Sequence, residues 1–294
     1  MNIQQSYKDT IHNEGSGKLY LVATPIGNLE DMTFRAVRML KEVDVIAAED
    51  TRQTRKLLNH YDIHTRLISY HEHNKQSSGK HIMERLESGE QVALVSDAGL
   101  PAISDPGFEL VREAIENGHD VIPIPGANAA LTGLIASGMD TSAFTFIGFP
   151  ARDKKMLKLQ LEHWGKWETT LMMYEAPHRV VKTLQMMLEI WGDRRIVLAR
   201  ELTKRHEEFL RGKISECIEH FIGNDPLGEF CMFIEGYERT AEDDQETSWW
   251  TSMSIQEHVS RYIQEGMPKK DAVKAAALDR GLPKREVYNE CIDL

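Results

Sequence analysis

The chain has few cysteines, and they are not arranged as metal ligands or as a redox pair. Its 294 residues include only Cys217, Cys231 and Cys291, which lie far apart, with no CxxC motif and no Cys/His spacing of a zinc site. Zinc-binding modules and thioredoxin-like redox centres are therefore disfavoured. We expect buried or free thiols in a reducing compartment, and no metal.

Long apolar runs are missing as well. No stretch approaches the ~20 apolar residues of a membrane span, and the polar N-terminus has no apolar segment like that of a signal peptide. We expect a cytoplasmic protein with no membrane partner, and we expect residues 1–17 to form a flexible tail. The hydrophobic content of 41% is sufficient for sizeable cores.

Basic residues are in deficit. The 46 acidic residues outnumber the 35 Lys and Arg residues, and the formal net charge is −11. This balance disfavours non-specific nucleic-acid binding, which depends on neutralising phosphates, but a local basic face remains compatible with it. Two segments could supply such a face, as RNA contacts or as ordinary solvated helix surfaces. They contain Arg152, Lys154, Lys155, Lys158 and Lys166 in one case, and Lys269, Lys270, Lys274, Arg280, Lys284 and Arg285 in the other.

A dinucleotide-binding motif is absent from the place where it is expected. The G-x-G-x-x-G sequence of NAD-dependent oxidoreductases follows the first strand of the fold. Here the apolar run 19–22 leads into residues 23–28, which contain a single glycine, Gly27. The sequence therefore argues against a dinucleotide-dependent oxidoreductase.

What the chain does contain is a regular alternation of strand and helix patterns, which predicts parallel α/β layering. Strands are predicted at 19–22, 43–48, 66–70, 92–95, 121–124, 144–148, 169–174, 195–200 and 229–235. Helices are predicted at 33–41, 54–60, 78–87, 108–117, 127–137, 151–164, 178–190, 214–221, 254–264, 270–280 and 284–291. We expect two α/β domains (18–138 and 139–237), an acidic linker (238–253) and a small helical appendage (254–294).

Turn-forming and charged residues gather where the predicted strands end. In open parallel sheets, ligands bind beyond the carboxyl ends of the strands. Any single turn of this kind is compatible with an ordinary helix cap, because Gly, Pro, Asp and Asn favour turns and caps. Seven such turns together favour a shared cleft, and they lie at 24–28, 49–52, 71–74, 97–107, 125–127, 174–179 and 200–203.

The most informative of these turns follows the strand 92–95. Residues 98–107 contain two glycines, two prolines and one acidic residue, but no Lys or Arg. Glycine lets a backbone approach a ligand closely, and proline presets the shape of a loop. A phosphate-binding loop usually brings a cation, as the P-loop lysine does. This loop, which follows Asp97, instead suits a positively charged ligand such as a sulfonium.

Several ordered segments together resemble the bacterial ribosomal RNA small-subunit methyltransferase I family, of the tetrapyrrole-methylase fold class. They are LYLVATPIGNLEDMTFRAVRMLKEVDVIAAEDTRQT, LISYHEHN, LVSDAGLPAISDPG, PIPGANAAL, YEAPHR and ARELTKRHEEFLRG, with a further likeness in KKDAVKAAALDRGLPKREVYNE. The resemblance implies two α/β domains of the class III methyltransferase type, with S-adenosylmethionine in the cleft between them. It also implies a homodimer that 2′-O-methylates a cytidine in the decoding centre of 16S rRNA.

Carried over to this sequence, the resemblance places the cofactor against a set of mostly small or rigid residues. These are Pro25, Ile26, Gly27, Asp97, Gly99, Leu100, Pro101, Ile103, Ser104, Pro125, Gly126, Ala127, Tyr174, Glu175 and Leu202. Main-chain groups would bind much of the adenosine. Leu100 departs from the commonest family pattern, which has Thr, so a side-chain hydrogen bond is in doubt there whereas a backbone contact is not.

The implied reaction is an in-line attack of a ribose 2′-oxygen on the sulfonium methyl group, for which a base or a nearby cation should help. Candidate catalytic residues are Glu49, Asp50, Arg52, His71, Asn74 and Arg179, with Glu72, His73 and Lys75 beside them. Arg52, Lys75 or Arg179 would position phosphate. For Asp50 a helix N-cap and for Arg52 an ordinary salt bridge are the structural alternatives, and the histidines could be ordinary surface or core residues.

Two other functions remain open at this point. A corrinoid or porphyrin precursor methyltransferase shares the implied fold, although the segments AEDTR, HEHN and YEAPHR favour the RNA enzyme. A non-catalytic ribosome-assembly factor is the alternative from a different class.

Overall fold

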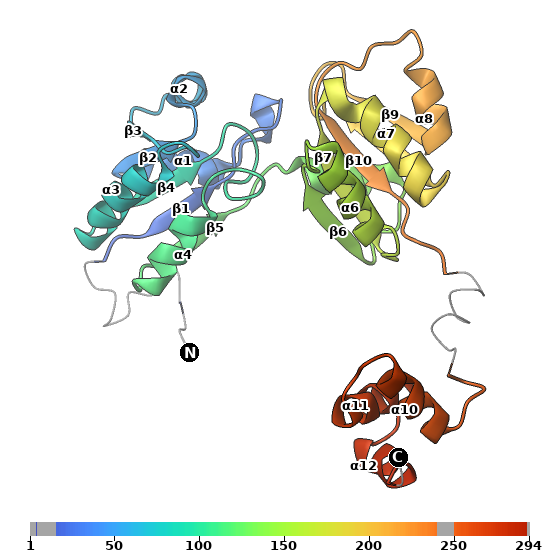
Figure 1. Ribbon diagram of the computed structural model, residues 1–294. Coiled ribbons are helices and arrows are strands. Elements are labelled where there is room, and N and C mark those ends of the chain that lie inside the picture. Colours follow the sequence, from blue (N-terminus) through green and yellow to red (C-terminus); the bar gives the residue numbers. More distant parts are fainter. Residues whose placement is uncertain (1–3, 5–15, 240–249, 293–294) are drawn as a thin grey trace. The chain divides into compact units, whose positions relative to one another are not determined.

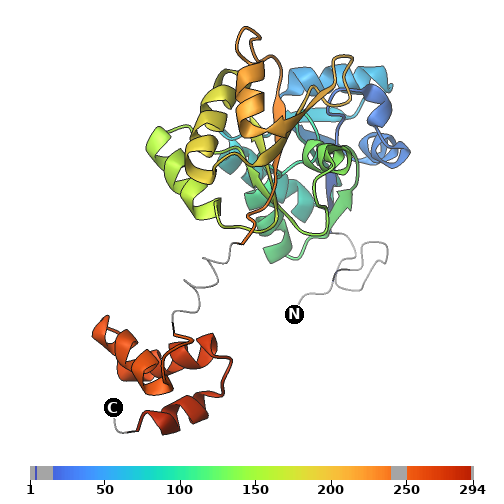
Figure 2. The same cartoon turned by 90° about the vertical axis from the view of Figure 1, so that its right-hand side faces the viewer.

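The computed structural model describes residue 4, residues 16–239 and residues 250–292 (Figures 1 and 2). The chain divides into two compact units, residues 1–237 and residues 238–294. Most of the predicted tail (1–17) and of the predicted acidic linker (238–253) lies outside the described residues. Among the residues that are described, no helix combines the length and apolar character needed to cross a membrane.

The first sheet of the larger unit is entirely parallel, with strand order β3-β2-β4-β1-β5. Its strands are β1 (Leu19–Val22), β2 (Val45–Ala48), β3 (Arg66–Ser69), β4 (Val92–Val95) and β5 (Val121–Ile124). Four-residue runs such as Val92–Val95 are buried throughout, which is typical of parallel strands covered on both faces. This confirms the parallel layering predicted for the first half.

Helices cover both faces of this sheet (Figure 1). On one face α1 (Phe34–Glu42) and α2 (Thr51–His60) pack against alternate strand residues such as Ile46 and Val95. On the other face α3 (Lys75–Glu87) and α4 (Phe108–Glu116) pack against the intervening residues, such as Val45 and Leu94. The two-residue period of a strand therefore builds two separate cores.

The second sheet is mixed, with order β6-β7-β10-β8-β9, which corrects the prediction that parallel layering continues through the second half. Its strands are β6 (Phe144–Gly148), β7 (Thr170–Glu175), β8 (Arg195–Arg200), β9 (Glu208–Lys213) and β10 (Phe230–Ile234). Only β6 and β7 pair in parallel. β10 lies between β7 and β8 and runs antiparallel to both, so β7 and β8 still point the same way.

Strand β9 was not predicted. It pairs antiparallel with β8 through its whole length and forms one edge of the sheet. Its sequence, EFLRGK, carries charged residues at three of its six positions, as edge strands commonly do. This charge hides the apolar alternation by which a strand is recognised in a sequence.

Helices also cover both faces of the second sheet. The helices α6 (Lys154–Trp164), α7 (Pro177–Trp191) and α8 (Ile214–His220) share one core with it. On the opposite face lies α5 (Ala129–Ser137), whose Ala130 and Leu134 pack with Met172 and Phe233. The last helix predicted for the first domain thus buries its apolar face against the second sheet.

Polar caps decide where several helices begin. Asp153 accepts a hydrogen bond from the Met156 backbone N–H, and α6 therefore begins at Lys154 and not at the predicted residue 151. Asn128 caps α5 in the same way through the Leu131 N–H. Capping by Asp50 lets α2 begin at Thr51, three residues earlier than predicted. A short 3-10 turn, η1 (Leu29–Asp31), precedes α1.

The smaller unit contains three described helices, α10 (Ile255–Gln264), α11 (Lys269–Asp279) and α12 (Lys284–Glu290), drawn in red in Figures 1 and 2. Val259, Val273, Ala276 and Val287 lie in its own hydrophobic core. Ser254 and Glu257 form a capping box at the start of α10. Helices were predicted at each of these places.

Candidate functional site

The strand order of the first sheet brings three of the predicted turns together. Because β1 lies between β4 and β5, the segments that follow these strands lie side by side at the carboxyl edge. Thr24 and Gly99 exchange two backbone hydrogen bonds, of 2.9 and 3.0 Å between N and O, and so join the β1 and β4 turns. Gly99 has φ +81°, a conformation that glycine adopts without strain.

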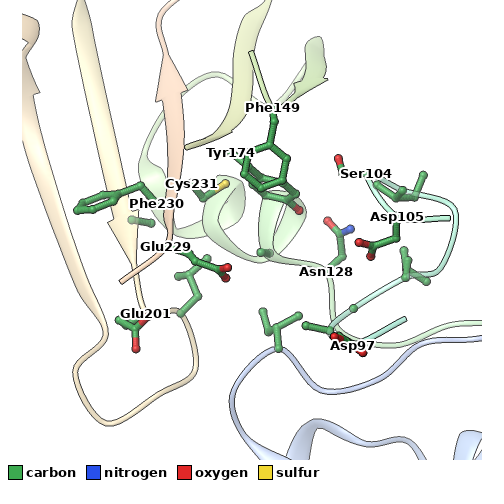
Figure 3. Close-up of a pocket in the computed structure, with 18 of the residues that line it drawn as sticks. Asp97, Ser104, Asp105, Asn128, Phe149, Tyr174, Glu201, Glu229, Phe230 and Cys231 are labelled. Atoms are coloured by element: carbon green, nitrogen blue, oxygen red, sulfur yellow. The ribbon is translucent and has the colours of Figure 1, made fainter. Parts of the chain in front are cut away.

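A cavity of about 290 Å³ opens at this edge (Figure 3), near the lower end of the roughly 300–1,000 Å³ of small-ligand pockets. Both sheets of the larger unit contribute to its wall. Its lining residues are Ile26, Glu49, Asp97, Ala98, Gly99, Leu100, Ile103, Ser104, Asp105, Asn128, Ala129, Phe149, Tyr174, Ala199, Glu201, Leu202, Lys204, Glu229, Phe230 and Cys231.

Backbone strain is concentrated in the two loops that face this cavity. Ala102 and Ser104, in the loop after β4, have φ of +66° and +63°. Glu201 and Thr203, in the loop between β8 and β9, have φ of +50° and +66°. Such conformations cost free energy in non-glycine residues and cluster at functional sites. The strain marks both loops as parts of one site.

The turn after β1 connects the two loops. A Cβ atom on Gly27 would lie 2.4 Å from Lys204 Cγ and 3.0 Å from the Leu202 carbonyl oxygen. Only glycine leaves room for this approach. The neighbouring Ile26 lines the cavity and belongs to the same apolar cluster as Leu202.

An aromatic group forms another wall of the cavity. The rings of Phe146 and Phe149 lie 4.9 and 5.4 Å from the ring of Tyr174, centroid to centroid. The Tyr174 hydroxyl accepts a hydrogen bond from the Ala130 N–H at the start of α5. Burial raises the pKa of Tyr174 to about 12, so the phenol is neutral and suits an apolar contact with a ligand.

The charge around the cavity is strongly negative. The acidic lining residues are Glu49, Asp97, Asp105, Glu201 and Glu229, and the basic one is Lys204. Lys204 is itself paired with Glu201, Nζ to Oε1 at 3.0 Å. In Figure 3 the carboxylates of Asp105 and Glu229 point toward the space between the two sheets.

These carboxylates perturb one another. Burial, followed by the negative charge of Glu49, raises the pKa of Asp105 to about 7, and Asp97 and Glu229 contribute to the rise. Burial and the charge of Asp97 also raise the pKa of Glu49. A cationic ligand placed among these groups would relieve their repulsion.

The structure brings eight of the fifteen predicted cofactor residues to the cavity wall: Ile26, Asp97, Gly99, Leu100, Ile103, Ser104, Tyr174 and Leu202. The other seven do not line it: Pro25, Gly27, Pro101, Pro125, Gly126, Ala127 and Glu175. Several of these support the wall from behind. A Cβ on Gly126 would lie 2.7 Å from Ala23 Cβ, and one on Gly99 would lie 3.5 Å from the Ala127 carbonyl oxygen.

Glu175 and Arg179 belong to a hydrogen-bonded network beneath the β7–α7 turn. The fully buried Glu175 accepts hydrogen bonds from the Ala176 N–H (2.9 Å) and the Thr183 hydroxyl (2.7 Å). Arg179 Nε lies 3.3 Å from Glu175 Oε1, and Arg179 also donates to the Pro150 and Ala151 carbonyl oxygens. Both side chains are thereby committed to holding the turn and the segment after β6.

Among the predicted catalytic residues, Glu49 is the one that lines the cavity. Asp50 caps α2 through the Arg52 N–H, and its carboxylate receives two further hydrogen bonds from the Arg52 guanidinium, at 3.1 and 2.8 Å. These bonds hold the pKa of Asp50 at about 2. The Asp50 backbone N–H in turn donates to Asp97 Oδ1 at 3.0 Å, so the β2 and β4 turns are joined.

The β3 turn carries the remaining predicted residues. Asn74 accepts a hydrogen bond from the His71 N–H (2.7 Å) and donates to the Ser69 carbonyl oxygen, which shapes this turn. His71 Nδ1 is buried and has no hydrogen-bond partner among the described residues. The imidazole also acts on the pKa of Glu49, which places it near that carboxylate. Lys75 pairs with Glu72 and Glu109.

The residues that sequence reasoning missed come mostly from the second sheet. Glu229, Phe230 and Cys231 line the cavity because β10 runs antiparallel, which brings its amino end to the edge where β7 and β8 end. A search confined to carboxyl ends of strands passes over them. Asp105 and Glu201 stood within predicted turns, where the surplus of acidic residues was the available signal.

No cluster of three or more His, Cys, Asp and Glu side chains within the described residues is arranged to hold a metal ion. All three cysteines are buried. Burial raises the pKa of Cys217 to about 11 and also raises that of the cavity-lining Cys231, which disfavours a nucleophilic thiolate.

Sequence comparisons identify close relatives of nearly the same length. The family model of the Tetrapyrrole (Corrin/Porphyrin) Methylases matches residues 18–218. The chain is 55% identical over 289 residues to the ribosomal RNA small subunit methyltransferase I of Halalkalibacterium halodurans, covering 98% of each protein. It is 57% identical over 273 residues to the protein of that name from Bacillus subtilis, covering 93% of each.

Solved structures share the fold at low sequence identity. A cobalt precorrin-4 methyltransferase of cobalamin biosynthesis matches with a TM-score of 0.57 at 15% identity, over 77% of this chain and 97% of that one. A uroporphyrin-III C-methyltransferase from Thermus thermophilus, complexed with S-adenosylhomocysteine, matches with a TM-score of 0.54 at 18% identity, over 74% and 97%. The chain therefore belongs to the tetrapyrrole methylase family, and within it to the group whose members are named ribosomal RNA small subunit methyltransferase I.

Proposed function

We propose that this protein is an S-adenosylmethionine-dependent methyltransferase that methylates the ribose 2′-oxygen of a cytidine in the decoding centre of 16S rRNA. The observation that carries the proposal is a cavity between two sheets with five carboxylates and one lysine, in a chain 55% identical to a relative named as a small-subunit rRNA methyltransferase. Such a charge balance suits a sulfonium and is poorly suited to a nucleotide phosphate.

The residues of the cavity fit the cofactor by their chemistry. Ile26, Leu100, Ile103 and Leu202 offer apolar contacts for an adenine ring, and the carboxylates offer acceptors for ribose hydroxyls and an amino group. Asp97, Gly99 and Ser104 follow the buried strand β4 and would hold the methionine part. When bound, S-adenosylmethionine supplies an electrophilic methyl group on a positively charged sulfur.

The acceptor would enter beside β2 and β3. Glu49 lines the cavity, and its raised pKa makes it a better proton acceptor than an ordinary carboxylate. His71, with its unpartnered Nδ1, lies close enough to influence Glu49. We infer that Glu49 accepts the proton of the 2′-hydroxyl and that His71 positions it. Arg52, 87% exposed at its side chain, would contact the RNA phosphate.

Two properties of the assembly are part of the same proposal. We place the protein in the cytoplasm, where the ribosomal subunit is assembled, and we expect a homodimer. Leu131 and Ile135, 46% and 79% exposed, form an uncovered apolar strip on α5, which supports association with a second copy. Light scattering at a series of concentrations would measure the mass directly, and a monomer throughout would contradict the dimer.

The deciding experiment is methyl transfer from labelled S-adenosylmethionine to small ribosomal subunits and to naked 16S rRNA, both from cells lacking this enzyme. We expect label in a 2′-O-methylcytidine after nuclease digestion. Label in a tetrapyrrole precursor, with none in RNA, would establish the corrinoid or porphyrin alternative. Binding to the subunit without transfer would indicate an assembly factor.

The same assay tests the acceptor side. Glu49→Gln should lower kcat about a hundredfold, because a positioned general base contributes on the order of 10²–10⁴ in rate. His71→Gln should lower kcat less and shift its pH profile. Near-wild-type rates for both variants would remove these residues from the mechanism.

A further inference from the structure

The C-terminal unit carries a basic groove that the methyl-transfer site does not account for. The groove is lined by Lys269, Lys270, Val273, Lys284 and Tyr288, from α11 and α12. The described part of this unit contains seven Lys or Arg residues against six acidic ones, in a chain with a net charge of −11. Positive charge is therefore locally concentrated in an acidic protein.

A short internal repeat creates the groove. Residues 266–271 read GMPKKD and residues 281–286 read GLPKRE. In each copy, glycine with positive φ (+95° for Gly266 and +61° for Gly281) follows a helix, proline precedes the next helix, and two cations begin it. Cations in the first turn of a helix oppose its dipole, so this repeat carries a cost in stability.

Helical spacing directs the repeat toward the groove. Lys270 and Lys274 are four residues apart on α11, and Lys284 and Tyr288 are four residues apart on α12, so each pair shares one helix face. Val273, buried in the core of the unit, lies at the base of the groove. The acidic residues Asp271 and Glu286 do not line it.

The groove lysines are available to a ligand. Lys270, Lys274, Lys284 and Arg285 are exposed and form no ion pair with a described residue. Arg280 behaves differently, because it donates to the Trp250, Met253 and Ser254 carbonyl oxygens and thus holds the unit together. Tyr288 is 55% exposed, an unusual setting for an aromatic ring beside three lysines.

We propose that this groove binds single-stranded RNA, with the lysines on the phosphate backbone and Tyr288 as a stacking surface for a base. Cations that follow a backbone, interleaved with an aromatic ring, are the arrangement that single-stranded nucleic acids require. The inference rests on the proposed function, because it assigns part of the substrate contact of an rRNA methyltransferase to this unit. Aromatic stacking distinguishes RNA from a merely anionic protein surface.

The test is the salt dependence of RNA binding by the full-length protein. Naked 16S rRNA from cells lacking the enzyme serves as the probe, and the dissociation constant is measured over a series of salt concentrations. For Lys270→Gln/Lys284→Gln we expect a log–log slope shallower by about 2, one for each lost phosphate contact. The matched control is Lys41→Gln/Lys80→Gln, which removes two exposed cations of the larger unit and should keep the wild-type slope.

Tyr288 provides an independent arm. Tyr288→Ala should weaken binding about fivefold or more without altering the slope, whereas Tyr288→Phe should bind like wild type, because stacking needs the ring and not the hydroxyl. An unchanged slope in the double lysine variant, or equal affinities for the two Tyr288 variants, would overturn the inference.

Methyl transfer at saturating RNA separates this inference from the proposed function. If wild type methylates RNA and all groove variants bind it normally, the groove inference alone fails. If wild type methylates no RNA, the proposed function fails, and the slopes still decide whether the groove binds RNA.

Discussion

The turns after β4 and β7 contain the same kinds of residues and serve different purposes. Both place acidic side chains beyond a buried strand, and both were predicted to contact the cofactor. After β4, the carboxylates of Asp97 and Asp105 line a cavity with no cation paired to them among the described residues. After β7, Glu175 is fully buried and bonded to Thr183 and Arg179.

This difference shows how a strand end becomes a binding site. A carboxylate whose acceptor capacity is filled by neighbours stabilises the turn in which it lies. One that faces a cavity among like charges has a perturbed pKa and gains from a cationic ligand, as Asp105 illustrates. Residue type alone does not separate the two cases.

Breaking the β7 turn should have the largest effect. Glu175→Ala removes the acceptor for three donors and leaves the mostly buried Arg179 without its carboxylate, so the free energy of unfolding should fall by about 3 kcal/mol. Urea denaturation measures this. The control Glu162→Ala removes an exposed carboxylate 3.8 Å from Lys158 and should change little. Wild-type stability combined with lost cofactor affinity would make Glu175 a ligand and erase the contrast.

The corresponding change in the β4 turn should affect binding and leave stability intact. In Asp97→Asn the amide oxygen can still accept the Asp50 N–H, but the negative charge at the cavity is lost. Affinity for S-adenosylmethionine should fall about tenfold, as for loss of a hydrogen bond to a charged group. Calorimetric titration measures this. The exposed Glu87→Gln is the matched control, and equal affinities for both variants would contradict the role of Asp97.

Asp105 should make cofactor binding depend on pH. Because its pKa is about 7, the carboxyl becomes charged as pH rises through neutrality, and affinity for the sulfonium should increase several-fold from about pH 6 to about pH 8. Asp105→Asn should abolish this increase, and S-adenosylhomocysteine, which lacks the sulfonium charge, should show a smaller one. A pH-dependent affinity that survives the substitution would assign the titration to another group, such as Glu49.

The same carboxyl has an opposite effect on stability. Its pKa is higher in the folded chain than in the unfolded one, so the folded state binds more protons between about pH 4 and pH 7. The free energy of unfolding contributed by this group therefore falls as pH rises through that window. Asp105→Asn should be more stable than wild type at neutral pH, as chemical denaturation at several pH values would measure.

The smallest effect is expected at Leu100. It lines the cavity, and Leu100→Thr restores the hydroxyl of the commonest family pattern while keeping the backbone in place. A single neutral hydrogen bond contributes on the order of 1 kcal/mol, offset here by lost apolar contact, so affinity should change only a few-fold. A change as large as that of Asp97→Asn would mean that side chains of this loop dominate cofactor binding over its backbone.

Much of the fold could be predicted from local patterns. The strands of the first half and most helices lie within a few residues of their predicted positions, because buried runs and amphipathic faces are written locally. The polar edge strand β9 escaped prediction for the converse reason. Helix starts shifted where a single cap, such as Asp153, outweighed the apolar pattern.

For the site, the sequence by itself determined the loop chemistry: an acidic, glycine- and proline-containing segment after β4, and with it a preference for a cationic ligand. The tertiary structure decided which of the strand ends share the cavity. The antiparallel insertion of β10 brought Glu229 to it, and the Thr183 hydroxyl and Arg179 withdrew Glu175 from it. Strand direction and side-chain partners depend on contacts distant in sequence, which no local pattern encodes.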